Sequence, residues 1–461
     1  MKYDCVIIGS GPGGYVAAIR ATQLNLKVAI IEKDSLGGIC LNWGCIPTKS
    51  FLRSAEVLKL IKNSTDYGIK SKLLDVDIKD IVKRSRDIAD KLSNGVAYLL
   101  KKNKVDVYFG LASFISKNKL LITQPDKKQL ELLTDNVVIA TGGRPQSLPI
   151  VKKSNNVWNY KDALQPTDIP KEILVVGSGA IGVEFASFYN QMGSAVTLIE
   201  SQNKIVPNED EEVSNFVEKR FLANKMKIFK DCLLIEVKDN GNEVKAKFVA
   251  NDKEYELNYE KIIIATGIVG NIGDLNLELI KIECEKQRVV VDEFCRTNIS
   301  NIYAIGDVAS APWLAHKASH EGVLVAEMIA GQKPYSIDRE NIPACTFCDP
   351  EIASIGLTEF KAKENNLDFK TGIFPFSANG KALAMGYENG FIKTIIDKKT
   401  GEFLGVHMVG AGVTELISSF SLAKGAEIIE ENIEKTVYPH PTLSEAIHES
   451  VLSASGKEIH I

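Results

Sequence analysis

The chain has 461 residues, of which 45% are hydrophobic and 25% are charged. This length exceeds the roughly 250–300 residues at which a single hydrophobic core stops growing, so we expect several domains. The net charge of −4 gives no electrostatic reason to expect binding to nucleic acid or to an anionic membrane. No apolar run is long enough to cross a bilayer, and no secretory or transit signal is recognisable. With eight mostly scattered cysteines, these features lead us to expect a soluble, cytoplasmic protein.

The first predicted unit is a strand, a glycine-rich turn, a helix and a second strand. An apolar strand at 5–8 leads into the turn at 9–14, and a strand at 28–31 ends at Glu32. The glycines that match the dinucleotide fingerprint are Gly9, Gly11 and Gly14. Such glycines let the backbone approach a pyrophosphate at the helix N-terminus, and Glu32 is placed to bind the adenosine ribose. A tight turn without a ligand would explain the glycines, but not both strands and the acid.

Two cysteines separated by four residues, Cys40 and Cys45, follow the first fingerprint. Four intervening residues make about one helical turn, so we expect both sulfurs on one face and close enough to bridge. Beside a redox cofactor such a pair can cycle between dithiol and disulfide. A structural disulfide across so small a loop would stabilise the fold less than one across a long loop. The spacing alone is equally compatible with a redox pair and with two reduced core cysteines.

The same unit occurs a second time. A strand at 173–176 leads into the turn at 177–182, and a strand at 196–199 ends at Glu200. The matching glycines are Gly177, Gly179 and Gly182. Two fingerprints predict two dinucleotides. The carboxylate of Glu200 favours the ribose 2′-hydroxyl of NAD over the 2′-phosphate of NADP, and Ser201-Gln202-Asn203 offers no arginine for such a phosphate.

Two further buried strands end in Ala-Thr-Gly, at 140–142 and 265–267. Each is expected to return the chain to a nucleotide-binding sheet. Before the first of them we expect a helix at about 78–101 and a β-rich segment at 105–133. The stretch at 146–170, rich in Pro, Asn and Asp, predicts the crossover between domains.

A later strand ends in Gly306-Asp307, and a helix at about 314–330, capped by Gly331, is expected after it. Asp307 is equally compatible with capping a helix and with binding a polyol chain. From residue 343 the pattern changes to alternating strands followed by helices, which predicts an α+β domain suited to dimerisation. The expected helices there are at about 414–424 and 444–454.

The last of these helices follows a proline-fixed loop that carries His440. Ser444 is predicted to cap the helix, with Glu445 in its first turn. A histidine on a stiff loop, five residues before a carboxylate, suits an acid–base catalyst whose tautomer the acid fixes. From the sequence alone, an ordinary surface histidine is equally compatible with this pattern.

Other cysteines and histidines have simpler explanations. Cys345 and Cys348 form a CxxC, but no second pair completes a zinc site, so we expect buried structural cysteines. His316 and His320 have helical i,i+4 spacing without an obvious third ligand. No metal site is therefore predicted.

Together these motifs resemble those of the class I pyridine nucleotide–disulfide oxidoreductases, over residues 3 to about 455. The motifs are GGICLNWGCIPTKS at 37–50, GSGAIGVE at 177–184, AIGDV at 304–308 with WLAHKASHEG at 313–322, and HPTLSEA at 440–446. The resemblance implies an α/β fold with two Rossmann-like domains for FAD and NAD, the first split by the second, and a C-terminal α+β dimerisation domain. The implied ranges are 1–145 for the FAD domain, 146–269 for the NAD domain, 270–340 for the segment that completes the FAD domain and 341–461 for dimerisation.

The resemblance also implies roles for individual residues. Cys40 and Cys45 would form the redox disulfide, with Cys45 against the flavin and Cys40 exchanging with the substrate. Lys49 would reach the flavin and pair with Glu184, in place of being a plain surface lysine. The residues implied to hold FAD are Gly9, Gly11, Gly14, Glu32, Lys49, Ala112, Thr141, Gly142, Asp307 and Ala315. Those implied to hold NAD are Gly177, Gly179, Ile181, Gly182, Glu200 and Gly267.

His440 resembles the family's catalytic base, which Glu445 orients and which comes from the partner subunit. The resemblance therefore implies a homodimer with active sites shared across the interface. The implied reaction is oxidation of protein-bound dihydrolipoamide by NAD, with the lipoyl group expected on another chain. The implied partners are lipoyl domains and the acyltransferase core of 2-oxoacid dehydrogenase complexes, or the glycine cleavage system.

Other activities within this family fit the sequence less well. Glutathione reduction would call for arginines that select NADPH, and mercuric reduction for a C-terminal cysteine pair. Transhydrogenation enzymes lack the complete pair that is present here. A flavoprotein with only a structural role would need none of these catalytic residues.

One departure concerns the second Ala-Thr-Gly, which the family usually continues as Arg-x-Pro-Asn. Here Ile268-Val269-Gly270-Asn271 follows, which questions the contacts near the nicotinamide.

Overall fold

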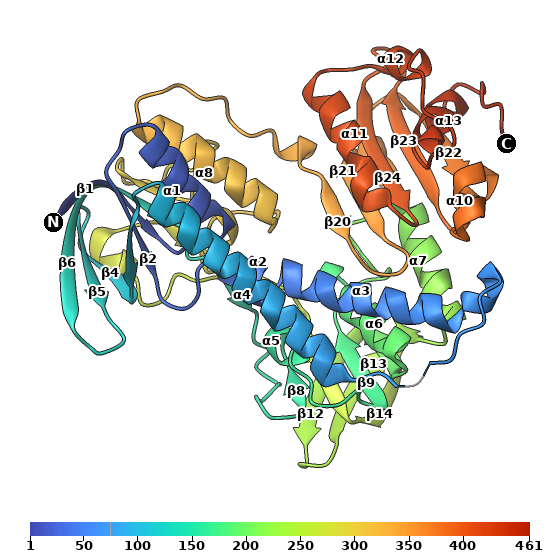
Figure 1. Cartoon of the computed structure of the whole chain (residues 1–461), viewed down its shortest axis with the longest axis horizontal. Helices are drawn as coiled ribbons and strands as arrows, with labels where there is room; N and C mark the ends of the chain where they lie inside the picture. Colours follow the sequence, from blue (N-terminus) through green and yellow to red (C-terminus); the bar gives the residue numbers. More distant parts are fainter. Residues whose placement is uncertain (74) are drawn as a thin grey trace.

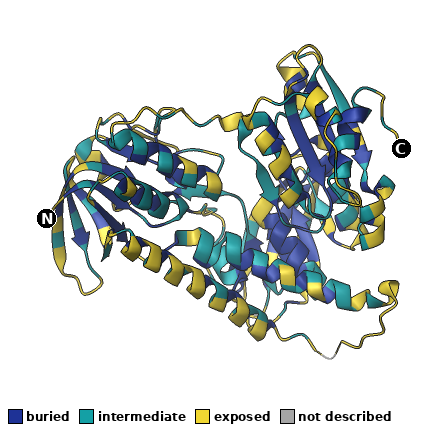
Figure 2. Ribbon diagram, turned by 45° about the horizontal axis from the view of Figure 1, so that its top comes forward, coloured by how far each residue is buried: buried dark blue, intermediate teal, exposed yellow. Residues whose placement is uncertain are grey.

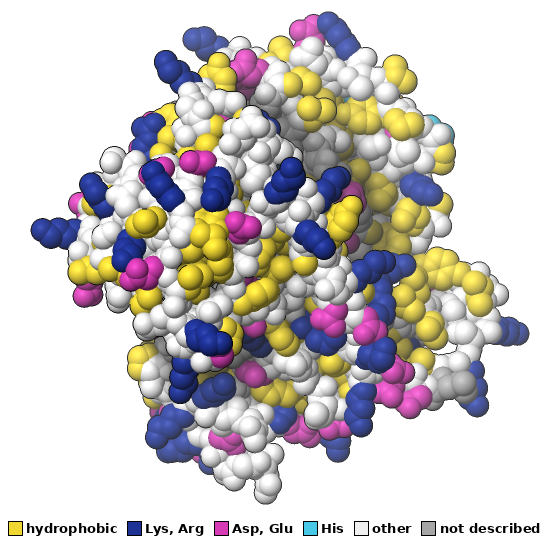
Figure 3. All heavy atoms as spheres, turned by 60° about the vertical axis from the view of Figure 1, so that its left-hand side comes forward, with side chains coloured by type: hydrophobic (Ala, Val, Ile, Leu, Met, Phe, Trp, Pro, Cys, Tyr) yellow, Lys and Arg dark blue, Asp and Glu magenta, His cyan; other side chains and the backbone are white. Residues whose placement is uncertain are grey.

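The computed structural model describes residues 1–73 and 75–461, which form three lobes, each built on a β-sheet (Figure 1). The chain begins in the first lobe and ends in the third. Among the described helices, none is long and apolar enough to cross a membrane. On the face that Figure 3 shows, basic and acidic side chains are interspersed.

The first sheet has the order β3-β2-β1-β6-β5-β4, and β19 pairs with β6. Its strands are β1 (Lys2–Ile8), β2 (Val28–Glu32), β3 (Asp106–Phe109), β4 (Leu111–Ser116), β5 (Lys119–Thr123), β6 (Gln129–Ile139) and β19 (Ile302–Ala304). The central strands are parallel and almost fully buried, as their apolar runs predict. Because β19 returns to this sheet after the second lobe, the second lobe interrupts the first, as the predicted fold class requires.

Helices cover the first sheet. They are α1 (Pro12–Gln23), α4 (Ile78–Lys102) and α8 (Ala315–Ile329). α1 and α8 pack closely, because a Cβ at Gly322 would lie 2.5 Å from the Gly13 carbonyl oxygen. The solvent side of α4 is exposed along most of its length (Figure 2). α2 (Gly38–Trp43) and α3 (Cys45–Lys62) run from this lobe toward the second.

The second sheet is parallel, with the order β11-β10-β9-β15-β8. Its strands are β8 (Val157–Trp158), β9 (Glu172–Val176), β10 (Ala195–Ile199), β11 (Lys227–Phe229) and β15 (Lys261–Ile264), and its helices are α5 (Tyr160–Ala163), α6 (Ala180–Met192) and α7 (Glu211–Ala223). A separate antiparallel sheet of β12 (Cys232–Asp239), β13 (Val244–Ala250) and β14 (Lys253–Tyr259) packs against it. A two-stranded ribbon, β7 (Gly143–Pro145) with β16 (Ile268–Gly270), connects the first and second lobes.

The third lobe has an antiparallel sheet in the order β20-β21-β24-β23-β22. Its strands are β20 (Ala344–Thr346), β21 (Ile352–Gly356), β22 (Phe369–Pro375), β23 (Phe391–Asp397) and β24 (Phe403–Val409). Its helices are α9 (Glu359–Glu364), α10 (Gly380–Met385), α11 (Val413–Gly425), α12 (Glu430–Glu434) and α13 (Glu445–Ser453). α13 lies on β22, where a Cβ at Gly372 would be 2.0 Å from the Ser450 carbonyl oxygen. This is the expected α+β lobe.

The remaining short elements are β17 (Cys284–Glu285), β18 (Arg288–Val289) and the 3-10 helices η1 (Ser64–Tyr67), η2 (Leu277–Ile280), η3 (Gly306–Val308), η4 (Arg339–Asn341) and η5 (Phe376–Ala378).

Two local predictions are wrong. The cysteine pair does not sit in one helical turn, because Gly44 breaks the helix between α2 and α3 with φ −135° and ψ −114°. Ser444 precedes α13, but within the described residues its side chain makes no cap; its hydroxyl lies 2.8 Å from that of Thr442.

Candidate active site

The redox segment begins where the first nucleotide loop ends. Gly37 and Gly38 have φ of +89° and +61°, and a Cβ at Gly38 would lie 2.7 Å from Gly11 Cα. Only glycine at position 38 therefore lets α2 start against the fingerprint loop. Cys40 lies in α2, and Cys45 is the first residue of α3.

The two thiols are electrostatically different. A hydrogen bond from Cys40 to Cys45 raises the pKa of Cys40, and burial raises it further. The same bond lowers the pKa of Cys45, against the effect of burial, and the charge of Lys49 lowers it as well. The position of Cys45 at the N-terminus of an 18-residue helix also favours its thiolate. The surroundings therefore favour a thiolate at Cys45 over one at Cys40.

Lys49 lies in α3, and its contacts connect this helix to the second and third lobes. Its Nζ lies 2.7 Å and 2.9 Å from the two carboxylate oxygens of Glu184 in α6. Glu184 also accepts a 2.9 Å hydrogen bond from the Phe347 backbone N–H, and the Lys49 ammonium lies 4.5 Å from the Phe347 ring centroid. The sequence-predicted partners thus meet at the junction of the three lobes. The Phe347 contact has no sequence signal, because it joins distant segments.

In the first nucleotide loop, Gly9 has φ +102°, and a Cβ at Gly14 would lie 1.9 Å from the Gly9 carbonyl oxygen. The buried Glu32 accepts hydrogen bonds from Ser10 N and Oγ at 2.9 Å and 2.6 Å. No side chain of the described residues caps α1, whose N-cap is Gly11, so its first N–H groups face the loop. This arrangement suits a phosphate group.

The second loop repeats the first. Gly177 has φ +96°, and a Cβ at Gly182 would lie 1.9 Å from the Gly177 carbonyl oxygen. Ser178 N and Oγ donate to Glu200 at 2.8 Å and 2.7 Å. These bonds hold the pKa of Glu200 below its ordinary value although burial raises it. Gly179 is the N-cap of α6, without a side-chain cap among the described residues, and Ile181 is exposed in the first turn.

The serine of each loop was not predicted as a site residue. Ser10 and Ser178 lie between the first two fingerprint glycines and 22 residues before the acid. Their repetition in both units was the available signal.

The other predicted cofactor residues lie outside the two fingerprint loops. Ala112 is buried in β4, and Thr141, Gly142 and Gly267 flank the β7–β16 ribbon. Asp307 lies in η3, where burial raises its pKa to about 6, against the lowering effect of Lys317. Ala315 begins α8.

A buried ion pair behind Asp307 was missed by sequence reasoning. Lys317 Nζ lies 3.0 Å from Glu321 Oε1, and Glu321 Oε2 accepts a hydrogen bond from Gly306 N at 2.7 Å. The pair therefore fixes the backbone that carries Asp307. Its i,i+4 spacing was the only sequence signal.

His440 and Glu445 form a separate site in the third lobe. The side chain of His440 is 78% exposed, and its Nδ1 lies 2.9 Å from Glu445 Oε1. Glu445 also accepts from Thr442 N at 2.8 Å. Although burial pushes the pKa of Glu445 upward, these hydrogen bonds keep it below its ordinary value. α13, which begins at Glu445, lies across the third lobe from α2 (Figure 1), so a single chain does not bring this histidine to its own cysteine pair.

The CxxC cysteines and His316 lie in ordinary structural surroundings. Cys348 is buried, and burial raises its pKa well above the ordinary value; burial also raises the pKa of Cys345 to about 11. His316 Nε2 is 2.8 Å from the Pro343 carbonyl oxygen. Within residues 1–73 and 75–461, no cluster of three or more His, Cys, Asp or Glu could hold a metal ion.

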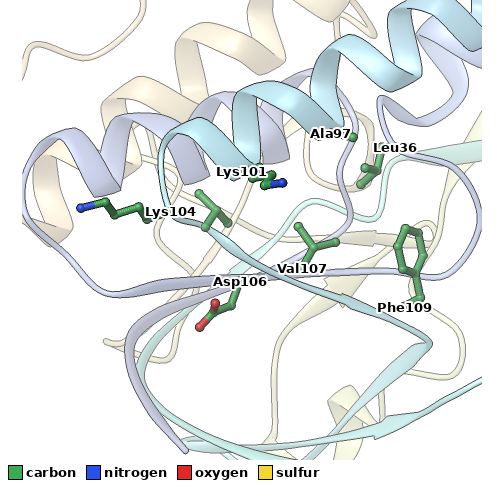
Figure 4. Close-up of a pocket in the computed structure, with 8 residues that line it drawn as sticks. Leu36, Ala97, Lys101, Lys104, Asp106, Val107 and Phe109 are labelled. Atoms are coloured by element: carbon green, nitrogen blue, oxygen red, sulfur yellow. The ribbon is translucent and has the colours of Figure 1, made fainter.

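A cavity of about 450 Å³ lies elsewhere, between the end of α4 and the edge strand β3 (Figure 4). Lys101, Lys104, Val107 and Phe109 are among its lining residues. None of the predicted site residues lines it. The candidate site is defined by the two loops and the cysteine pair, not by this cavity.

Comparison with known proteins gives a consistent picture. The family model described as "Pyridine nucleotide-disulphide oxidoreductase" matches residues 3–322, and that of its dimerisation domain matches residues 342–451. A dihydrolipoyl dehydrogenase of Zymomonas mobilis is 46% identical over 99% of both chains. One of Rhizobium etli is 44% identical over 100% of this chain and 99% of its own.

Solved structures are also similar. The structure of LpdA from Mycobacterium tuberculosis has a TM-score of 0.90 and 25% identity, over 97% of this chain and 98% of its own. The flavoprotein disulfide reductase RclA from Escherichia coli has a TM-score of 0.88 and 26% identity, over 98% and 99% of the two chains.

Proposed function

Because this chain belongs to the pyridine nucleotide–disulphide oxidoreductases, which are enzymes that use FAD and NAD, we propose that it is a dihydrolipoyl dehydrogenase. In this proposal it oxidises protein-bound dihydrolipoamide to lipoamide and reduces NAD⁺ to NADH. The observation that carries the proposal is the placement of the cysteine pair: Cys40 in α2 and Cys45 at the start of α3 follow directly on the contact between Gly38 and the first fingerprint loop, and their surroundings shift their pKa values in opposite directions. Two thiols with different tasks are what dithiol–disulfide exchange requires.

The residues present fit both cofactors. Each loop has a glycine cradle that a Cβ would fill and a helix N-terminus without a side-chain cap among the described residues, as a pyrophosphate requires. We assign the first loop, with Glu32, to FAD, because the cysteine segment begins against it. We assign the second, with Glu200, to NAD, because a buried carboxylate disfavours a 2′-phosphate. Bound FAD would supply the two-electron acceptor for the reduced cysteine pair and the hydride for NAD⁺.

The protein's own groups account for the exchange with the substrate. The partner subunit's His440 accepts a proton from one dihydrolipoamide thiol, and the thiolate attacks Cys40 of the Cys40–Cys45 disulfide. A substrate–Cys40 bond forms, and Cys45 leaves as a thiolate. The second substrate sulfur then displaces Cys40, which takes up the second proton. Lipoamide leaves oxidised by two electrons, and the cysteine pair is reduced by two.

Two parts of the proposal concern assembly. The dimerisation domain belongs to the family, and a homodimer would bring His440 of one subunit to the cysteine pair of the other. The lipoyl groups would come from the lipoyl domains and acyltransferase core of a 2-oxoacid dehydrogenase complex, or from glycine cleavage. We also propose a cytoplasmic location, because eight mostly scattered cysteines in a chain of this length suit a reducing compartment.

A steady-state comparison of three reactions tests the proposal. The purified enzyme is offered dihydrolipoamide with NAD⁺, glutathione disulfide with NADPH, and NADH with an oxidised nicotinamide analogue. We expect the dihydrolipoamide reaction to dominate. Activity confined to either of the other two reactions would overturn the proposed function.

A further inference from the structure

The β7–β16 ribbon joins the two Ala-Thr-Gly loops directly. β7 begins one residue after Gly142, β16 begins one residue after Gly267, and the register pairs Gly143 with Gly270. Two further backbone bonds cross between the loops: Gln146 N to the Gly267 carbonyl at 3.0 Å, and Asn271 N to the Gly142 carbonyl at 2.9 Å. The separation of the two loops is therefore set by this short ribbon.

The side chain of Asn271 hydrogen-bonds to the first Ala-Thr-Gly loop. Its Nδ2 donates to the Thr141 and Gly143 carbonyl oxygens at 2.9 Å and 3.0 Å, and Thr141 Oγ1 donates to the Asn271 carbonyl at 2.7 Å. The segment that follows the second Ala-Thr-Gly loop therefore holds the backbone on both sides of Gly142.

Arg144 completes the connection from the opposite strand. Its Nη1 donates to the Gly270 carbonyl at 2.6 Å, and its Nη2 donates to Gln287 Oε1 at 2.8 Å. A guanidinium can make both bonds at once, because its donors are arranged in a planar fork. Arg144 therefore fastens β16 to its own strand and to the turn before β18.

The departure at 268–270 is explained by the same contacts. Gly270 N donates to the Gln287 carbonyl at 3.1 Å, and a Cβ at Gly270 would lie 2.6 Å from that oxygen. A proline at 270 has no N–H to donate and would collide with Gln287. The ribbon therefore requires glycine at position 270. The arginine that the family usually has in this segment is replaced by Arg144 on the facing strand, β7.

We propose that Arg144, acting with Asn271 through the β7–β16 ribbon, is a positioning residue that aligns the nicotinamide of bound NAD with the flavin for hydride transfer. Its guanidinium hydrogen-bonds to the Gly270 carbonyl, to Asn271 Oδ1 at 3.5 Å and to Gln287 Oε1, so it acts through the spacing of the Thr141–Gly142 and Thr266–Gly267 loops. Hydride transfer is sensitive to displacements of about 1 Å. Of the residues expected to hold NAD, Gly267 adjoins the ribbon, whereas Gly179 and Glu200, with the rest of the second fingerprint, lie on other loops and are left intact. This inference rests on the family's cofactors, not on the proposed dithiol substrate.

The test is rapid-mixing reduction of the enzyme flavin by NADH, with no dithiol present. In Arg144→Met, the limiting reduction rate should fall about tenfold while the Kd for NADH stays within about twofold. Arg144→Lys should recover part of the rate, because one donor can still reach the Gly270 carbonyl. Gln287→Ala should give a smaller loss than Arg144→Met. Arg296→Met, which removes an exposed arginine paired with Asp292, should match the wild type.

Hydrogen exchange gives a readout that does not depend on turnover. In Arg144→Met the amides of Gln146, Gly270 and Asn271 should exchange faster, while those of Ser10 and Ser178 and the FAD content stay unchanged. A weaker Kd with an unchanged limiting rate would overturn the inference, as would loss of FAD or unchanged exchange and rate. Should Arg144→Met not fold, Arg144→Lys and Gln287→Ala decide by the same criteria. Because NADH alone reduces the flavin here, failure of dihydrolipoamide oxidation would reject the proposed function without touching this result.

Discussion

The two dinucleotide units of this chain are nearly identical in their loops. In each, a serine donates its N–H and hydroxyl to one oxygen of a buried glutamate, and the other oxygen accepts the N–H two residues beyond the glutamate. Gly9 and Gly177 have φ of +102° and +96°. The local sequence alone therefore specifies a dinucleotide loop, wherever it occurs in the chain.

The units differ in the segment that comes after the glutamate. Beyond Glu32 lies the cysteine segment, which begins against the first loop. Beyond Glu200 the chain instead runs to Asp210, the N-cap of α7, which binds the buried Lys393 of the third lobe. One unit thus leads into the proposed redox pair, and the other carries an attachment to the third lobe. Substitutions in each unit can test this division of labour.

The largest effect is expected from the cysteine beside the first loop. Cys45→Ser should lower dihydrolipoamide-dependent NADH formation by roughly 10³-fold or more, because the pair can no longer form a disulfide. Cys232→Ser, a buried cysteine of the second lobe, is the matched control and should keep wild-type turnover. Steady-state assays measure both. Wild-type turnover in Cys45→Ser would remove the disulfide from the mechanism.

His440 should serve the chemistry of the first unit only. His440→Gln removes the proposed proton acceptor, so dithiol oxidation should fall by about 10²–10⁴-fold. Reduction of the flavin by NADH should be unchanged, since that step uses no substrate thiol. Glu445→Gln should cost less, because it disturbs only the orientation of the ring. Equal losses in both half-reactions, measured separately, would contradict this assignment.

The attachment of the second unit should matter for stability, not chemistry. Lys393 is fully buried and bonds to Asp210 at 2.8 Å, Glu359 at 2.7 Å and also Glu212. Burial alone would lower its pKa, but these bonds raise it. Lys393→Met would leave the buried Asp210 carboxylate, and the more exposed Glu212 and Glu359, without this cation, and should lower the free energy of unfolding by about 3–5 kcal/mol.

The control for Lys393 is an exposed ion pair in the same lobe. Lys398→Met breaks the contact with Asp368 and should cost less than about 1 kcal/mol. Denaturant unfolding measures both variants. A smaller loss for Lys393→Met than for Lys398→Met would show that the buried Lys393 cluster does not hold the lobes together.

The Lys49–Glu184 pair should tune the thiolate of the first unit. Lys49 lowers the pKa of Cys45 and Glu184 raises it, beside the larger lowering effect of the Cys40 hydrogen bond. Lys49→Met should therefore move the pH at which the thiolate–flavin charge-transfer band appears upward, with about a tenfold loss of turnover near neutral pH. Glu184→Gln should move it downward. A pH titration of the two-electron-reduced enzyme decides, and shifts of the same sign would contradict this account.

Features set by neighbouring residues could be predicted from the sequence, and most features set by distant residues could not. The Lys49–Glu184 pair is the exception, because the family resemblance implied it. Both strand–turn–helix units and the positions of Glu32 and Glu200 followed from local patterns. The break at Gly44 did not, because spacing does not reveal that its backbone leaves the helical region. The Ser444 cap failed because Ser444 is already helical, with φ −66° and ψ −18°, whereas a capping residue is usually extended. The Lys393 cluster joins segments about 180 residues apart, so it left no local signal.

The smallest effects should separate the two loops themselves. Ser10→Ala and Ser178→Ala each remove one hydroxyl hydrogen bond to a buried glutamate, which costs about 1 kcal/mol. If the loops act independently, Ser10→Ala weakens only FAD retention and Ser178→Ala raises only the Kd for NAD⁺, each by about fivefold. Flavin release and NAD⁺ titration measure the two effects. If Ser178→Ala speeds FAD release as strongly as Ser10→Ala does, the two units are coupled through the β7–β16 ribbon and α3. Their similar loops would then not imply that they act independently.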